Sequence, residues 1–456
     1  MLDQEKILVS LTWLSKVDGR DIRTEDTVEK LVDDASVQIN AAFSKLSHDI
    51  GHWKLVWGPA IYVSFDRITP YVADNVIYIA REMDASGNPG PNYFIGIAGT
   101  NPISWYGWLN EDFAVKATYP WSGRPDNGYI AKGTETGLQN LLNLKAGMEN
   151  PKTLMDFLND EIDHQKVTIS FGGHSLGGTL APVLALYLIE KKKDWKGENV
   201  SFRVRAYAGA TPGDKTFANH FRKAIVNNKV DFGAYNNVLD IVPKAWNRLD
   251  ATPGLFASLH PFCICQYKRN NKHYTVMGVI NKNQDNQLIN GLMKWAKTIS
   301  GQTDYTPLGS VHNFPKNPYS SGIDLDNCRN PRREGTCCRM HRFVDLLLAE
   351  SRIEKTIGYN LRQIYGIMGG VGNLKGHTLV TFLDFMAEAG HQHTRAYLDY
   401  LLDADHNLDF INDLTNIVDA TSKRPGQQKA QLLYEKRLLN KFTETIWKVL
   451  KPDLSG

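Results

Sequence analysis

The sequence predicts an α/β fold, with a doubly wound, mostly parallel sheet and helices on both faces. Short apolar runs rich in β-forming residues alternate along the chain with longer segments of helical periodicity, as in a parallel sheet with crossover helices. A glycine-rich turn joins one such run, Val167–Phe171, to a long apolar helix that ends near Lys191. The functional side chains of such a sheet are expected at the carboxyl ends of its strands.

Length and composition fit a soluble globular protein. The 456 residues are 42% hydrophobic and 22% charged, enough for a large core. The net charge of +3 is too small to favour nucleic acid or an anionic membrane as a partner, and no apolar run is long enough to form a membrane-spanning segment. The first residues lack the basic start and apolar run of a signal peptide. We therefore expect a cytoplasmic protein, or one secreted without its leader in this sequence or by another route.

Before the glycine-rich turn, periodicity and turn residues define the expected elements. Thr27 is placed to cap a helix over 27–46, and Val76 to Ile79 form the centre of a strand over 75–83. A turn rich in Gly, Pro and Asn over 84–91 precedes a buried strand over 93–98. The other expected elements are a short helix within 1–25, a strand within 53–65, and helices over 128–146 and 151–163.

The turn itself fits the G-x-S-x-G pattern of a nucleophile elbow, Gly173-His174-Ser175-Leu176-Gly177, between a strand and a helix. The elbow holds its nucleophile in a sparsely populated backbone conformation, and the glycines let strand and helix approach closely. The amide of Leu176 falls at the helix N-terminus, which favours an anion. A serine in a loop that binds phosphate, or nothing, is the alternative. The strand–turn–helix context favours Ser175 as a nucleophile.

A second donor for an oxyanion is expected upstream of the elbow. Gly99-Thr100 follows the strand over 93–98, where folds with this elbow supply that donor. The Thr100 amide, with its hydroxyl, is the candidate. A threonine that only caps a turn is the alternative.

After the elbow, the alternation continues with a strand over 202–208, a helix over 214–226 and a strand over 230–235. Asp240 lies just past this last strand, which suits the acid of a triad in the chain order Ser, Asp, His. Such an acid accepts the second imidazole N–H and stabilises the imidazolium. An aspartate that caps the next turn is the alternative.

From about residue 246 to residue 375 the pattern is irregular, and we expect an insertion or cap within a single domain of 1–456. Strand-like pieces over 262–267 and 274–280 and a helix over 284–299 occur here. All five Cys lie in this range, and a small, odd number of Cys does not indicate a disulfide framework. We expect no metal site, because the spacing of the possible ligands does not form zinc knuckles; they are Cys328, Cys337, Cys338 and His341. The glycines of 366–376 lack dinucleotide spacing and suit a hinge or a loop over the site.

The histidine that acts as the base must follow Asp240 in the chain if the triad has the order Ser, Asp, His. The chain returns to helices over 377–389, 392–402 and 429–450, and a loop just ahead of a helix can present an imidazole over the sheet edge. The candidates among the later histidines are His260 and His273, which are near Asp240 in the chain, and His312, His377, His391 and His393. The residues alone do not choose among them. No acidic or Cys partner flanks the last two, which argues against a metal site there.

Four pieces of the chain resemble the class 3 lipase family, fungal-type lipases with the α/β-hydrolase fold. The pieces are Ala98-Gly99-Thr100 with Trp108 to Asp112, Gly173 to Gly178, Asn237 to Pro243, and Gln392 to Leu398. The resemblance covers about 75–245 and then a few residues near 393. Two features depart from the family pattern: Ala98 stands where the family often has Arg, and the separation between Asp240 and His393 is longer than in compact members.

The resemblance implies a catalytic triad. The serine of GHSLGG is the family's nucleophile and the Asp of N-x-x-D-x-V-P is its acid, which correspond to Ser175 and Asp240. The family's base is the His of an H-x-x-x-Tyr helix start, which selects His393 over His391 and His377.

The resemblance also implies an oxyanion hole and an activity. The Thr of the G–T step and the residue after the nucleophile form the hole, hence Thr100 and Leu176. The implied reaction is hydrolysis of carboxylic esters, with acylglycerols at a lipid–water interface as the expected substrate and no cofactor or metal. Phospholipase A1 and short-chain or aromatic esterases are alternatives, because the same triad serves them. An inactive hydrolase-fold binding protein is the alternative of another class.

Overall fold

The computed structural model describes the α/β core and a few later segments of the chain. The described residues are 2–16, 27–63, 73–99, 115–147, 149–247, 263–269, 272–277, 300–301, 303–309, 311–314, 392–402, 410 and 413–414.

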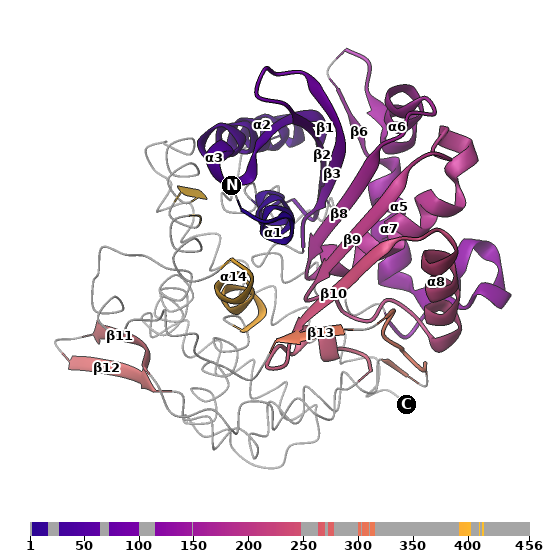
Figure 1. Ribbon diagram of the computed structural model, residues 1–456. Helices are drawn as coiled ribbons and strands as arrows, with labels where there is room; N and C mark the ends of the chain where they lie inside the picture. Colours follow the sequence, from indigo (N-terminus) through magenta and orange to yellow (C-terminus); the bar gives the residue numbers. More distant parts are fainter. Residues whose placement is uncertain are drawn as a thin grey trace.

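A seven-stranded sheet forms the centre of these residues (Figure 1). Its order is β1-β2-β3-β8-β9-β10-β13, antiparallel from β1 to β3 and parallel from β3 to β13. The strands are β1 (His52–Tyr62), β2 (Asn75–Met83), β3 (Pro89–Ile97), β8 (Thr168–His174), β9 (Ser201–Tyr207), β10 (Asp231–Asn237) and β13 (Val311–Phe314). The predicted mostly parallel sheet is confirmed, and the carboxyl ends of its parallel strands share one edge.

Helices cover both faces of this sheet (Figure 1). One face carries α5 (Lys132–Asn143), α6 (Leu154–Ile162), α7 (Leu176–Glu190) and α8 (Lys215–Asn227). The other carries α1 (Gln4–Leu14), α2 (Val28–Lys45), α3 (Ser47–Ile50) and α14 (Arg395–Leu401). Each layer of helices buries its own apolar cluster against the sheet, which is the packing of an α/β fold.

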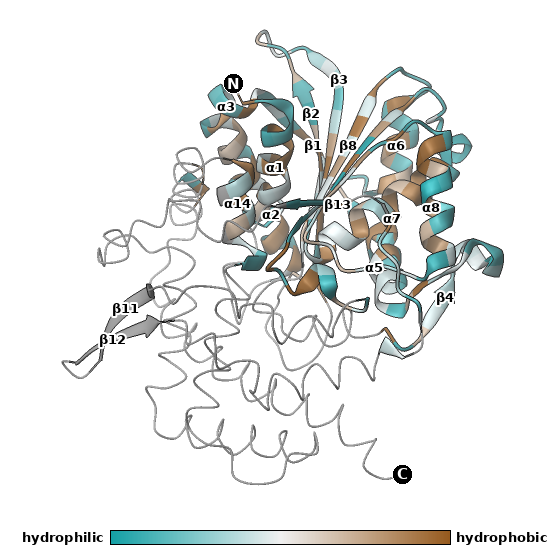
Figure 2. Ribbon diagram, turned by 60° about the horizontal axis from the view of Figure 1, so that its bottom comes forward, coloured by the Kyte–Doolittle hydropathy of each residue, from teal (hydrophilic) through white to brown (hydrophobic). Residues whose placement is uncertain are grey.

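The elbow helix α7 is buried around nearly its whole circumference. All its residues except Tyr187 and Glu190 are buried, because it packs between the sheet and its neighbouring helices. Figure 2 shows α7 as largely hydrophobic, whereas α8, nearer the outside, carries hydrophilic residues. A helix that is apolar on all sides is typical of such a central position. This packing fixes the N-terminus of α7 beside the end of β8.

Short elements complete the described chain. Three hairpins pair β4 (Thr118–Pro120) with β5 (Tyr129–Ala131), β6 (Lys145–Ala146) with β7 (Lys152–Thr153), and β11 (Cys263–Arg269) with β12 (Lys272–Met277). Single turns of 3-10 helix occur at η3 (Trp121–Gly123), η4 (Pro125–Asn127), η5 (Lys192–Trp195) and η6 (Val242–Lys244).

The helix expected over 128–146 is shorter than predicted, and α5 begins only at Lys132. Gly128 has a φ of +86°, which a right-handed helix does not contain, and residues 129–131 pair with β4 instead. The helix over 27–46 is confirmed as α2, with the Thr27 hydroxyl accepting the amide of Lys30.

Several expectations lie outside the described residues. They are the helices over 284–299, 377–389 and 429–450, the glycines of 366–376, and the group formed by Cys328, Cys337, Cys338 and His341. Of the range 246–375, only short segments are described, and one of them, β13, is a strand of the central sheet. That this range forms a cap stays a prediction.

Candidate active site

Ser175 occupies a sharp turn between β8 and α7. Its φ of 63° and ψ of −125° lie in a region that residues other than glycine rarely adopt. The glycines on either side make the turn possible. A Cβ on Gly173 would lie 2.0 Å from the carbonyl oxygen of Gly177, and a Cβ on Gly177 would lie 2.2 Å from that of Ile97. Strand, turn and helix therefore meet backbone to backbone, as a nucleophile elbow requires.

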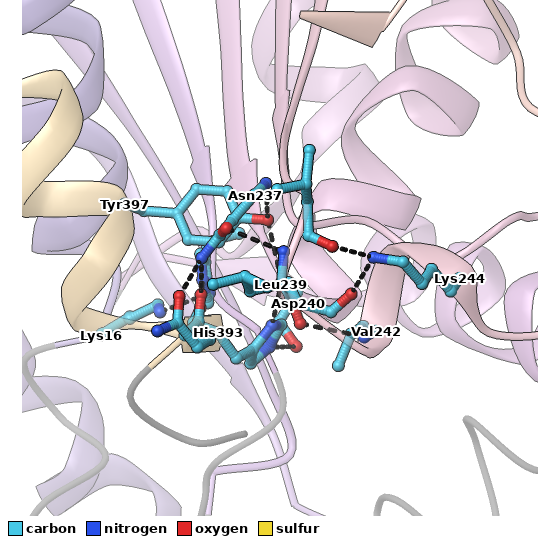
Figure 3. A network of polar contacts seen from close by, with 12 residues as sticks. Lys16, Asn237, Leu239, Asp240, Val242, Lys244, His393 and Tyr397 are labelled. Atoms are coloured by element: carbon cyan, nitrogen blue, oxygen red, sulfur yellow. Dashed lines mark hydrogen bonds and ion pairs between the residues drawn. The ribbon is translucent and has the colours of Figure 1, made fainter. Parts of the chain in front are cut away.

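His393 joins this serine to Asp240 in one chain of hydrogen bonds. His393 Nε2 lies 2.8 Å from Ser175 Oγ. His393 Nδ1 lies 2.8 Å from Asp240 Oδ2 (Figure 3). Asp240 is fully buried, and Ser175 and His393 are each 7% exposed. The serine comes from the elbow, the aspartate from the turn after β10, and the histidine from the residues just before α14. The structure thus brings three residues singled out in the sequence into the geometry of a charge-stabilised triad.

Asp240 accepts two further hydrogen bonds. The amide of Val242 lies 2.9 Å from Oδ1, and the hydroxyl of Tyr397 lies 2.8 Å from Oδ2. Burial raises the pKa of Tyr397 well above its ordinary value, and the charge of Asp240 raises it further, so the hydroxyl keeps its proton and donates. Bonds of this kind stabilise a carboxylate that has lost most of its water.

Hydrogen bonds also join the turn after β10, here called the acid turn because it contains Asp240, to the segment that contains His393. The side-chain amide of Asn237 donates to the backbone carbonyl of Gln392 at 2.9 Å and to its side-chain oxygen at 2.6 Å. The backbone amide of Asn237 donates to the Tyr397 hydroxyl at 2.9 Å. Lys244 Nζ donates to the carbonyls of Val238 and Asp240, at 2.6 and 2.8 Å, and closes the acid turn (Figure 3). The segment before α14 is therefore held against the turn after β10.

The predicted oxyanion hole is described in part. Leu176 is the first residue of α7, a position whose amide has no acceptor within the helix. Gly99 lies close behind the serine, since a Cβ on it would be 2.4 Å from the carbonyl oxygen of His174 and 2.9 Å from Ser175 Cβ. Thr100 lies outside the described residues.

The other histidines considered do not join this cluster in the described residues. His312 lies in β13, where its ring stacks on Tyr235 at a centroid distance of 5.0 Å. His273 lies in β12, and His260, His377 and His391 are outside the described residues.

Sequence reasoning missed the supporting side chains of this site. Asn237, Gln392 and Tyr397 stand inside the motifs that carried the resemblance, but no role was assigned to them. One signal was available for Tyr397: it follows His393 by four residues, which places both on one face of a helix.

Comparison with known proteins bears on the family of this segment of the chain. Residues 98–249 match the sequence model of the family described as lipase (class 3). This segment belongs to the class 3 lipases. The resemblance drawn from the motifs is thereby confirmed, and with the fold it makes the chain a serine ester hydrolase.

Among solved structures, several lipases are similar to this chain. The crystal structure of M37 lipase has 20% sequence identity and a TM-score of 0.58, over 92% of this chain and 97% of that one. A lipase–propeptide complex from Rhizomucor miehei has 18% identity and a TM-score of 0.36, over 54% of this chain and 63% of that one. A lipase from Rhizopus microsporus var. chinensis has 16% identity and a TM-score of 0.36, over 61% and 78%. A comparison with curated proteins found no match.

Two further features of the described residues concern membranes and metals. No helix among them is long and apolar enough to cross a membrane. Within the same part of the chain, no cluster of three or more His, Cys, Asp or Glu side chains is arranged to hold a metal ion.

Proposed function

We propose that this ester hydrolase cleaves acylglycerols with Ser175 as nucleophile, His393 as base and Asp240 as acid. The observation that carries the proposal is the unbroken hydrogen-bond chain from Ser175 Oγ through both ring nitrogens of His393 to Asp240, with its serine on a strained elbow. A nucleophile, a base and a group that orients the base are the three parts that acyl transfer needs.

The reaction follows from the positions of these atoms. His393 Nε2 takes the proton of Ser175 Oγ as the oxygen attacks the ester carbonyl, and Asp240 stabilises the imidazolium through Nδ1–H. The tetrahedral oxyanion is held by the amides of Leu176 and Thr100. His393 then gives its proton to the leaving alcohol. A water molecule, deprotonated by the same ring, attacks the acyl-serine and releases the carboxylic acid, and the ring returns the proton to Ser175 Oγ.

The acylglycerol part of the proposal rests on the match to the class 3 lipase family. The proposal also includes a cap over the site. Ser175 is only 7% exposed, so a long acyl chain would have to reach a nearly buried hydroxyl. We propose that residues 246–375, apart from the sheet strand β13, contribute the cap over the site. Phospholipids and short or aromatic esters are the competing substrates, because the triad treats every ester carbonyl alike.

Hydrolysis of p-nitrophenyl esters tests the triad. Wild type, Ser175→Ala, His393→Ala and Asp240→Asn are compared, with circular dichroism as the control for folding. We expect kcat to fall by about 10⁴–10⁶ in each folded variant. If His393→Ala stays active while Ser175→Ala is dead, the base is another histidine. If wild type neither hydrolyses esters nor reacts at Ser175 with an organophosphonate, the chain is a binding protein.

Emulsified triacylglycerol, phospholipid vesicles and soluble short-chain esters, offered to the same preparation, test the substrate. A preference for the emulsion supports the acylglycerol assignment. A preference for vesicles would replace the acylglycerol assignment with a phospholipase, and a preference for the soluble esters would replace it with an esterase.

The variant Thr100→Val separates the two possible oxyanion donors of Thr100, because it keeps the backbone amide and loses the hydroxyl. A fall of about 10²–10³ in kcat would assign the hydroxyl to the oxyanion hole, and wild-type kcat would leave that role to the amide.

A further inference from the structure

Lys16 and His174 form a chain of contacts that ends on the backbone of His393. Lys16 Nζ lies 2.6 Å from His174 Nδ1, and His174 Nε2 lies 2.6 Å from the carbonyl oxygen of His393. Lys16 follows the C-terminal end of α1, and His174 is the last residue of β8, next to the nucleophile. The contacts thus connect the N-terminal helix to the base, and they use none of the atoms assigned to the triad.

The two partners of His174 allow one protonation state. An ammonium has only N–H donors, so Nδ1 accepts a hydrogen bond and carries no proton. A carbonyl oxygen only accepts, so Nε2 carries the proton and donates a hydrogen bond to the backbone carbonyl of His393. Burial lowers the pKa of His174 well below its ordinary value, and the charges of Lys16 and His393 lower it further, which keeps the ring neutral.

Aromatic packing holds both members of the pair in place. The ring of Trp13 on α1 lies 4.7 Å from the ring of His174, and Lys16 Nζ lies 4.7 Å from the centre of the Trp13 ring. The His174 ring also lies 4.7 Å from that of His393 and 5.6 Å from that of Tyr397. His174 is buried, with 1% of its surface exposed, so its two polar contacts are both needed to offset the loss of water.

The backbone at His393 benefits from such an anchor because a break at Thr394 separates it from α14. α14 begins at Arg395, and Thr394 between them has a φ of −124° and a ψ of −70°. The preceding carbonyl, that of Gln392, is held by Asn237 of the acid turn. The carbonyl of His393 is held by His174 of the elbow. Two consecutive peptide groups are thus fixed, one to the acid side and one to the nucleophile side of the triad.

We propose that Lys16 is a positioning residue for the base: it sets the tautomer of His174, which fixes the His393 backbone and so the approach of the imidazole to Ser175. The inference rests on the proposed function of the triad. Displacement of a catalytic group by about 1 Å can cost roughly 10² in rate, so loss of this anchor should be visible in turnover.

The decisive variants are Lys16→Met and Lys16→Arg, assayed on a soluble p-nitrophenyl ester. Lys16→Met keeps a long side chain without its ammonium, and we expect kcat to fall about tenfold with KM within about twofold, since only the transition-state geometry changes. Lys16→Arg keeps a charged donor and should restore most of kcat.

Glu5→Gln is the matched control on the same helix. Glu5 binds Arg205 of β9 through both of its oxygens, at 2.6 and 2.7 Å, and so docks α1 without touching the Lys16–His174 contacts. It should lower stability and leave kcat unchanged. If Glu5→Gln lowers kcat as much as Lys16→Met, docking of the helix explains the effect and the inference is wrong.

His174→Phe supplies a second background, because it keeps a ring beside Trp13 and has no ring nitrogen. Lys16→Met should cause no additional loss there. If Lys16→Met lowers kcat in the His174→Phe protein as much as it does in wild type, the inference is wrong while the triad stands. The same holds if Lys16→Met alone has the kcat of wild type. If His174→Phe fails to fold, the comparison of Lys16→Met with Lys16→Arg decides alone. An inert wild type overturns the proposed function, and the inference with it.

Discussion

The hydroxyl of Tyr397 connects Asp240 to α14, the helix that follows His393. It donates to Asp240 Oδ2, the same oxygen that binds His393 Nδ1, and accepts the amide of Asn237. Asp240 is fully buried, so each donor that faces it replaces lost water. Tyr397 thereby helps to hold the Asp240 carboxyl group turned toward the imidazole.

Tyr397→Phe should lower both turnover and stability. Loss of a hydrogen bond to a buried charged group costs about 1.5–3 kcal/mol, and the amide of Asn237 loses its acceptor as well. We expect kcat to fall about tenfold at constant KM, together with a lower midpoint in urea. Tyr119→Phe in β4 is the control, since that residue is 45% exposed. Equal behaviour of the two variants would contradict the role given to Tyr397.

The elbow depends on close backbone contacts, which is a property of the elements rather than of the serine alone. A Cβ on Gly177 would meet the carbonyl oxygen of Ile97, and neither backbone can shift easily because Ile97 and Gly177 are both buried. Gly137 in α5 offers a matched comparison. A Cβ there would meet only carbons of the Leu180 side chain, at 3.0 Å.

Gly177→Ala should therefore be much more costly than Gly137→Ala. Overpacking against rigid backbone typically costs about 1–3 kcal/mol or more, whereas alanine in a helix interior gains up to about 1 kcal/mol over glycine. We expect Gly177→Ala to lose stability and activity, and Gly137→Ala to stay within about 1 kcal/mol of wild type. Urea midpoints measure both. A tolerated Gly177→Ala would mean that the approach of β3 and α7 is looser than 2.2 Å implies.

The elements before residue 245 could largely be predicted because each carries a local signal. Thr27 caps α2, a glycine-rich turn precedes β3, and Asp214 caps α8 by accepting the amide of Phe217. The hairpins of β4 with β5 and β6 with β7 could not, because strands of two or three residues have no periodicity to detect. The position of β13 beside β10 depends on long-range pairing in the same way.

At the scale of the whole molecule, the site is assembled from segments that pattern alone cannot connect. Asp240 and His393 are 153 residues apart, and only the H-x-x-x-Tyr spacing of the family singled out His393. The contact between Lys16 and His174 spans 158 residues and arises because α1 packs across the ends of β8 and β3. Nothing in the local sequence of either residue indicates the other.

The buried neutral His174 also makes a prediction for the stability of the whole chain. Its pKa in the folded protein is lowered well below the ordinary value, first by burial and then by Lys16 and His393, whereas in the unfolded chain it is about 6.5. Below that pH the unfolded state binds a proton that the folded state does not. The free energy of unfolding therefore falls as the pH drops below about 6.5, by up to about 1.4 kcal/mol per pH unit from this group.

His174→Gln removes the titration and keeps a donor and an acceptor. The slope of unfolding free energy against pH, from urea titrations between about pH 7 and pH 5, should be shallower in the variant by up to that amount. Because the other histidines are common to both proteins, the difference isolates His174. Parallel slopes would mean that His174 titrates alike in the folded and unfolded chains. A ring that is fully buried between Trp13 and His393 and bonded to an ammonium has no means of doing so.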